Sequence, residues 1–126
     1  MSFKYFDRDD FKCKGTSCCN GSNKTEDAFI GSLDELRERV GFPLIVSSGY
    51  RCPEHNQKVS STGPNGPHTT GRAVDLAVSH DKAWFVLNEA FRMGFTGVGV
   101  NGKGAGRFIH LDAISDPDKR PRVWSY

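Results

Sequence analysis

Apolar residues recur at helical spacing in the segment 25–41. Thr25 can act as the N-cap, acidic residues follow it in the first turn, and Gly41 can end the helix as its C-cap. The apolar positions, three or four residues apart, are Phe29, Leu33, Leu36 and Val40. This spacing predicts an amphipathic helix.

A second helical pattern covers the segment 79–94, with Ser79 as the N-cap and Gly94 as the stop. The pattern predicts a helix of the same kind as the first. The apolar residues that it carries are Trp84, Leu87 and Phe91, with Ala83 and Ala90 beside them.

Short apolar runs between turn-forming residues predict four strands, at 44–46, 74–78, 98–100 and 108–114. The glycine-rich segment 101–106 between the last two is typical of a hairpin loop. The segment 53–67 is dense in Pro, Gly, Asn and Ser, which predicts a long loop. The segment 1–24 has weak periodicity, and we expect four aromatic residues to hold it on the core: Phe3, Tyr5, Phe6 and Phe11.

Together these elements predict an α+β fold, with a small, mostly antiparallel sheet and helices packed on one side. The chain has 126 residues, which is enough to bury a core, and no repeat or linker divides it. We therefore expect one domain, 1–126. Separately, we expect the chain to act as a monomer.

The formal charge of +2 is too small to favour a nucleic acid as partner. The basic segment 119–122 is expected to be solvated, or to help the protein settle on an anionic polymer such as a cell wall. No apolar run approaches the ~20 residues of a membrane helix, and the segment 1–5 lacks the apolar part of a signal peptide. We expect a protein made in the cytoplasm, without membrane insertion, that something else delivers to any target outside.

Three of the four cysteines, Cys13, Cys18 and Cys19, lie in a polar stretch, and the fourth is Cys52. Their spacing is not that of a zinc knuckle, and no second CxxC or nearby His completes one. The favoured interpretation is reduced thiols in a cytosolic protein. A disulfide between Cys52 and one of the other three, formed after release, ranks second. A structural metal site ranks third.

The strongest candidate chemistry lies in two imidazoles and a carboxylate. Six residues separate His68 from Asp75, and His110 follows in a later predicted strand. A carboxylate between Val74 and Leu76 either faces water or has a partner, such as a metal, that offsets its desolvation. His68, Asp75 and His110 can close on one zinc ion and leave a fourth position open, as in catalytic zinc sites. The alternative is that all three are surface residues in contact with solvent.

Three other patterns carry less weight. Residues 97–102 match G-x-G-x-x-G, but a dinucleotide site must open a helix, and here another strand follows. The glycosylation patterns at Asn20 and Asn23 have no meaning without export. Cys52 lies beside Arg51 and near His55, but a thiol nucleophile is the weaker interpretation.

Four separated blocks occur in a set order: Ser48-Gly49-Tyr50-Arg51, Glu54-His55-Asn56, His68-x-x-Gly71-x-Ala73-x-Asp75 and Phe108-Ile109-His110. Together they resemble the zinc D-Ala-D-Ala carboxypeptidases and their murein endopeptidase relatives. That group includes phage endolysins and shares its fold with the hedgehog signalling domain. The resemblance covers essentially the whole chain. It implies one zinc ion bound by His68, Asp75 and His110, substrate carboxylate or oxyanion binding by Arg51, and structural support of that loop by His55 and Asn56.

The chain departs from many relatives at two positions. Gly66 stands where many have Ser, two residues before the first zinc-binding His. Arg107 stands where several have an acid that serves as general base, and Arg cannot accept a proton at working pH. Side chains two apart on a strand share a face, so we predict that Asp112, beside His110, is the catalytic base, with its carboxylate aimed at the water on the metal.

The predicted function is that of a zinc metallopeptidase, a carboxypeptidase or endopeptidase, that cuts stem peptides or crosslinks of bacterial peptidoglycan. The short chain resembles phage enzymes that reach the wall through lysis or injection. The alternative is a zinc-containing cell-wall-binding or phage structural module of the same fold without catalysis, an interpretation that Arg107 favours.

Overall fold

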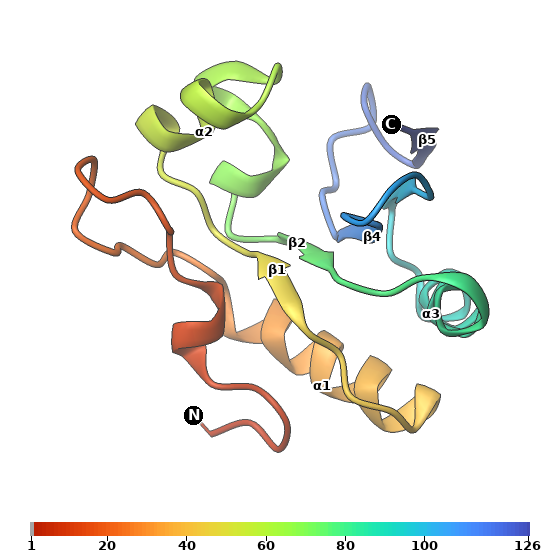
Figure 1. Cartoon of the computed structure of the whole chain (residues 1–126). Helices are drawn as coiled ribbons and strands as arrows, with labels where there is room; N and C mark the ends of the chain where they lie inside the picture. The colour runs from red at the N-terminus through yellow and green to blue at the C-terminus, as the bar shows by residue number, and fades with distance from the viewer. Residues whose placement is uncertain (1) are drawn as a thin grey trace.

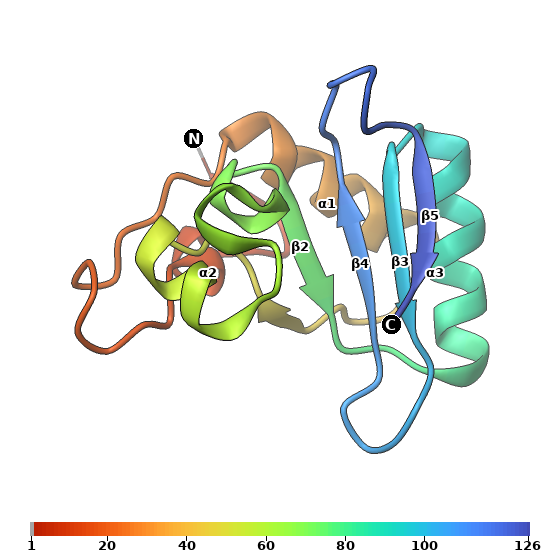
Figure 2. The same cartoon turned by 90° about the horizontal axis from the view of Figure 1, so that it is seen from above.

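In the computed structural model, which describes residues 2–126, five strands form one sheet: β1 (Val46–Ser48), β2 (Ala73–Leu76), β3 (Gly97–Asn101), β4 (Phe108–Asp112) and β5 (Arg122–Ser125). Their order is β1-β2-β4-β3-β5. All neighbours pair antiparallel except β3 and β5, which are parallel. Figure 2 shows β2, β4, β3 and β5 side by side. The predicted α+β fold with a mostly antiparallel sheet is confirmed.

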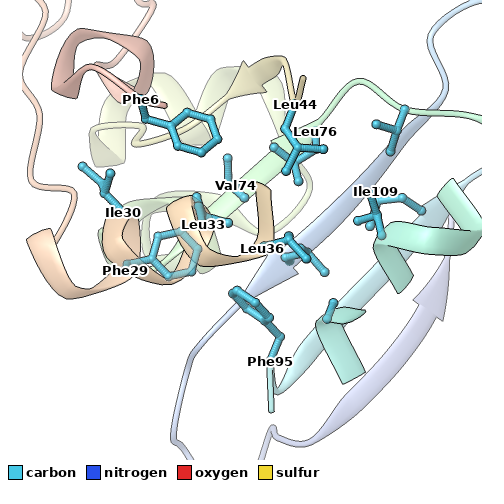
Figure 3. Packing of buried hydrophobic residues seen from close by; sticks show 14 of the residues in the cluster. Phe6, Phe29, Ile30, Leu33, Leu36, Leu44, Val74, Leu76, Phe95 and Ile109 are labelled. Atoms are coloured by element: carbon cyan, nitrogen blue, oxygen red, sulfur yellow. The ribbon is translucent and has the colours of Figure 1, made fainter. Parts of the chain in front are cut away.

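Two long helices, α1 (Asp27–Val40) and α3 (His80–Met93), cover one face of the sheet. The side chains of β2 and β4 that point toward these helices are Val74, Leu76, Ile109 and Leu111, and all are buried in the core. Figure 3 shows Leu33 and Leu36 of α1 among them. The ring of Phe29 meets the ring of Phe95 edge-on at 6.1 Å between centroids. The alternate side chains of the same strands face away from the helices and form the candidate site.

The predicted helix ends are largely confirmed. Gly41 and Gly94 are both C-caps in the left-handed conformation, with φ of 79° and 86°, which glycine adopts without a side-chain clash. Ser79 is the N-cap of α3. The predicted cap at Thr25 is wrong by one residue, because Glu26 holds that position. The buried Thr25 hydroxyl instead donates a hydrogen bond to Asn23 Oδ1, at 2.6 Å.

The predicted long loop over 53–67 is wrong. The segment contains helix α2 (Pro53–Val59) and the short 3-10 helix η2 (Gly63–Asn65), and its last residue begins a second 3-10 helix, η3 (Pro67–Thr69). Each has a proline in its first turn, where the fixed φ favours a helix start and the missing N–H costs nothing. Figure 1 shows α1 below β1 and β2, and α2 above them.

The arm before α1 contains a further 3-10 helix, η1 (Arg8–Phe11), and two of its predicted anchors are buried, Phe6 and Phe11.

The burial pattern of α3 differs from a simple apolar stripe. Trp84 and Phe91 are 63% and 52% exposed, because α3 has more apolar residues than the sheet and α1 can cover. Within residues 2–126, no helix is long and apolar enough to cross a membrane.

The strand boundaries are also shifted from those predicted. β1 begins at Val46, where the predicted strand ended, and Ile45 is exposed. β4 ends at Asp112, two residues earlier than predicted, and β5 was not predicted at all. The predicted hairpin between β3 and β4 is confirmed, since Asn101 pairs with Phe108 across it.

Candidate metal centre

Three side chains on the polar face of the sheet converge on one point. Asp75 on β2 lies opposite His110 on β4, and His68 comes from η3, just before β2. Asp75 Oδ1 lies 3.2 Å from His68 Nε2 and 3.1 Å from His110 Nδ1. One donor atom of each residue lies within 4.8 Å of the others, and all three residues are buried. The structure therefore brings together the three predicted ligands.

This donor set fits a zinc ion. Ligands at ~2.0–2.1 Å from a tetrahedral zinc lie roughly 3.3 Å apart, close to the two measured separations. Burial alone would raise the pKa of Asp75, but the close contacts with His110 and His68 outweigh it and hold the pKa well below its usual range. Asp75 is therefore an anion at neutral pH, as a metal ligand must be.

The other nitrogen of each imidazole is held by an acceptor. His68 Nδ1 donates to the carbonyl of Gly49 at 2.7 Å, and His110 Nε2 donates to Asp112 Oδ2 at 2.8 Å. These bonds select the tautomer in which His68 Nε2 and His110 Nδ1 present their lone pairs to the common point. Such acceptors behind a metal-binding histidine orient the ring and strengthen it as a ligand.

Asp112, the predicted base, is held by two partners. It shares the strand face of His110, as expected, but its carboxylate is fully buried. Arg120 binds it through two hydrogen bonds, from Nε to Oδ1 at 2.9 Å and from Nη2 to Oδ2 at 2.7 Å. Burial would raise the pKa of Asp112, but the bonds from His110 and Arg120 lower it to about 2. The carboxylate therefore faces these two partners, and its role as the general base stays a prediction.

Two glycines of β3 make room for this arrangement. A Cβ on Gly97 would lie 2.2 Å from Asp112 Oδ1, and a Cβ on Gly99 would lie 2.5 Å from Trp124 Nε1. Trp124 on β5 in turn covers the ring of His110, with 5.0 Å between centroids. Gly97 and Gly99, two glycines of the pattern that resembles a dinucleotide motif, therefore leave the space that Asp112 and Trp124 occupy.

Arg51 lies beside the three ligands, with its guanidinium held on several sides. Nε donates to Ser48 Oγ at 3.1 Å, Nη1 donates to Asn56 Oδ1 at 3.0 Å, and Nη2 lies 3.6 Å from Asp75 Oδ2. The predicted supporting residue Asn56 is itself fully buried and donates to Thr62 Oγ1. A guanidinium has five N–H donors, so this grip orients Arg51 and leaves donors for a substrate anion.

The three ligands and Arg51 line one cavity of ≈ 390 Å³. Aromatic residues of the C-terminal strand region close one side, and the end of α2 with the following turn closes another. Asp75 is the only acid among the described residues that line it. The other lining residues are Val59, Ser60, Ser61, Thr62, Pro67, Trp124 and Tyr126.

Both departures from the relatives have a structural basis. A Cβ on Gly66 would lie 2.0 Å from Thr62 Oγ1 and 2.7 Å from Asn56 Nδ2, so serine does not fit beside this turn. Arg107 precedes β4 and pairs with His80 at the start of α3, with 2.6 Å between Nη1 and Nε2. Arg107 is absent from the residues that line the cavity.

Sequence reasoning missed the residues of the C-terminal segment. Arg120 belongs to the basic run that was expected to be solvated, yet its side chain is only 7% exposed against Asp112. Trp124 and Tyr126 lie two apart and line the cavity together. The alternation of aromatic residues at the end of the chain was the available signal for this strand.

A buried three-ligand centre that opens on a cavity is typical of metallohydrolases. The chain belongs to the Peptidase M15 family, whose family model matches residues 4–112. Membership implies a zinc-dependent peptidase and a peptidoglycan substrate, in agreement with the resemblance noted from the sequence. No curated protein and no solved structure matches the chain. Arg120, Trp124 and Tyr126 lie beyond the matched range.

Proposed function

We propose that this protein is a zinc peptidase that hydrolyses peptide bonds in the stem peptides or crosslinks of bacterial peptidoglycan. The convergence of His68, Asp75 and His110 beneath a cavity carries the proposal, because three protein ligands leave one position for chemistry. A zinc ion held there would supply a Lewis acid that polarises the scissile carbonyl and activates water.

The chain's own residues bind and orient the substrate. Arg51 holds a substrate carboxylate or the developing oxyanion, since its guanidinium is fixed at the edge of the ligand set. Tyr126 offers a second donor. Partial burial raises the pKa of its phenol above the usual range, so the hydroxyl stays protonated at neutral pH and can donate to an oxyanion. Asp112 positions His110 through its hydrogen bond.

One observation favours a second candidate function. Among the described residues that line the cavity, no carboxylate is left over once Asp75 is counted as a ligand. A zinc-containing module that binds the cell wall, or a phage structural part, would need none. The two candidates differ in turnover and agree in wall binding.

Digestion of purified peptidoglycan separates them. The peptidase should release new amino groups, and mass spectrometry of the products should identify the bond and distinguish carboxypeptidase from endopeptidase cleavage. His110→Ala should abolish release and most of the zinc bound at this centre, because the other two ligands cannot hold it alone. Wall binding in a pull-down without release at full zinc loading would reject the peptidase and support the binding module.

We also propose a cell-wall site of action that is reached by phage-type release or delivery, and a single chain as the active unit. All the residues assigned to the centre come from one chain, which supports the second point. Cells that express the protein should lyse only after a membrane pore is opened, which tests the site of action. Light scattering should give the mass of one chain for the active protein, which tests the single-chain unit.

A further inference from the structure

Four cysteine side chains converge in a second cluster, outside the candidate metal centre. Cys13, Cys18 and Cys19 come from the N-terminal arm, and Cys52 is the N-cap of α2. Each Sγ lies within 4.8 Å of the other three. The Sγ of Cys18 lies 4.0 Å from that of Cys13 and 3.6 Å from that of Cys19, and all four cysteines are free.

These separations fit a metal better than a disulfide. Four thiolates at ~2.3 Å from a tetrahedral zinc lie roughly 3.8 Å from one another. The sulfurs of a disulfide lie ~2.05 Å apart, about half of the two measured distances. A four-iron cluster is larger than this space, since its thiolates do not approach one another so closely. One ion at the middle of the four sulfurs accounts for the geometry.

The surroundings of the sulfurs resemble a prepared ligand shell. The backbone N–H of Cys52 donates to Cys13 Sγ, and that of His55 donates to Cys52 Sγ, each at 3.4 Å. Such N–H donors behind the sulfurs are in place to orient metal-bound thiolates. A Cβ on Gly15 would lie 2.3 Å from Cys18 Sγ, so the bare glycine lets the arm fold closely over the cluster.

The arm itself has little else to hold it in place. Between Lys14 and Lys24 the chain has no large apolar side chain, and Cys18 and Cys19 are its least polar residues. The loop closes through the bond from Cys13 N to Ser22 O, at 2.9 Å. Burial of apolar surface cannot offset the entropy of ordering such a segment, whereas a metal can.

Charges near the cluster favour an anionic complex. Lys14 and Lys58 line the same hollow as Cys18 and His55. A zinc ion with four thiolates carries a net charge of about −2, and the two lysines add positive charge on this side of the cluster. The ammonium of Lys14 is held by Ser47 O, and that of Lys58 lies 3.9 Å from Glu54 Oε1.

We propose that Cys13, Cys18, Cys19 and Cys52 bind one structural zinc ion. Binding replaces four thiol protons, which pass to solvent, and four S–Zn bonds form without any redox change. The site is independent of the peptidase chemistry. It joins the N-terminal arm to the residue that follows Arg51. The structural metal, which ranked third on spacing alone, is therefore the interpretation that the geometry favours.

Metal analysis of the full chain, purified with zinc under reducing conditions, tests the proposal. The wild type should bind about two zinc ions, because the two sites are separate. A His68→Ala/His110→Ala variant should keep about one, and its cobalt form should show the intense sulfur-to-cobalt charge-transfer absorption of a thiolate site. Cys18→Ser should lose that absorption, whereas the neighbouring Ser17→Ala should keep it.

Two results would overturn the proposal. One is a histidine-site double variant that is folded and free of zinc, which does not depend on whether a cysteine variant folds. The other is a wild-type mass that is lower by the hydrogens of one or two disulfides, with no cobalt–thiolate absorption. Loss of peptidase activity bears on neither result, so this proposal and the proposed function fail separately.

Discussion

His68 and His110 each have one ring nitrogen that points away from the candidate metal position. The hydrogen bond of this outer nitrogen decides how well the residue can bind a metal. A neutral imidazole has one donor and one acceptor nitrogen, and only the acceptor can bind an ion. The carbonyl of Gly49 takes the proton of His68, and the carboxylate of Asp112 takes that of His110. The carboxylate is the stronger acceptor, so Asp112 has the larger influence on its ligand.

Asp112→Asn separates positioning of His110 from proton transfer. We expect a ~10–100-fold loss of zinc affinity, the usual effect of removing such an acceptor, and near-normal turnover once zinc is saturating. Zinc titration with a competing chelator gives the first quantity, and peptidoglycan digestion at excess zinc gives the second. Asp118→Asn, at an exposed acid on the loop before β5, is the control. Normal zinc affinity with a ~100-fold lower rate would support Asp112 as the base.

Arg51→Lys should impair turnover nearly as much as Arg51→Ala. Ser48, Asn56 and Asp75 contact the planar guanidinium of Arg51. The ammonium group of a lysine cannot reproduce these contacts or a bidentate contact with a carboxylate. Zinc content should stay normal in both variants, and Arg92→Lys at an exposed site serves as the control. Steady-state kinetics on a defined peptide would show the lower turnover. Wild-type rates for the lysine variant would mean that Arg51 contributes only its positive charge.

At the scale of elements, the sequence predicts what local periodicity and turn chemistry determine. Both long helices, the hairpin and the strands that carry Asp75 and His110 were predicted, because their apolar patterns are regular. Helix α2 was missed because its proline was taken as a sign of a loop, although proline also starts helices. β5 is harder to predict, because its only local signal is the alternation of Trp124 and Tyr126, and its parallel pairing with β3 is a long-range contact.

The same distinction explains the result for the site. The three ligands were predictable because their residue types and spacing are characteristic of zinc. The partners of Asp112 were not, because Arg120 is one of several basic residues and only the fold selects it. In the sequence, where Arg120 is not seen to bind it, Asp112 looks like a free carboxylate beside the metal, which favours its prediction as the base.

Gly97→Ala tests the packing of β3 against β4 beneath the site. The added Cβ would meet all three carboxyl atoms of Asp112 within 2.3 Å, and Arg120 and His110 hold that carboxylate in place. We expect a loss of ~1–3 kcal/mol in the free energy of unfolding, together with weaker zinc binding. Urea denaturation and chelator competition measure the two effects.

Gly102→Ala is the matched control for this change. It lies in the hairpin after β3, and nothing lies within 4 Å of its added Cβ. Its free energy of unfolding should change by no more than ~0.5 kcal/mol. If Gly97→Ala were equally neutral, Asp112 would be free to move, and its fixed position behind His110 would not hold.

At the scale of the whole molecule, consecutive residues, Arg51 and Cys52, connect the cavity of the candidate metal centre to the cysteine cluster. Arg51 lines the cavity, and Cys52, the next residue in the chain, is a member of the cysteine cluster and the N-cap of α2. Arg51 N also donates to the carbonyl of His68, at 3.0 Å. A metal at the cysteines would therefore restrain the backbone just after the substrate-binding arginine, and the bond to His68 restrains Arg51 itself.

Stepwise removal of zinc should separate these two contributions. Three ligands and an open position hold a metal less firmly than four thiolates, so a mild chelator should first remove the zinc at His68, Asp75 and His110. Activity should disappear at that step, and adding zinc should restore it, while the arm stays folded. Removal of the second ion should then lower the melting temperature by at least ~5 °C, because the loop between Cys13 and Ser22 loses the metal that orders it. Calorimetry and activity, followed against zinc content, would show the order. Loss of both ions in a single step, or activity that survives the first, would mean that the two centres do not have the separate roles assigned to them.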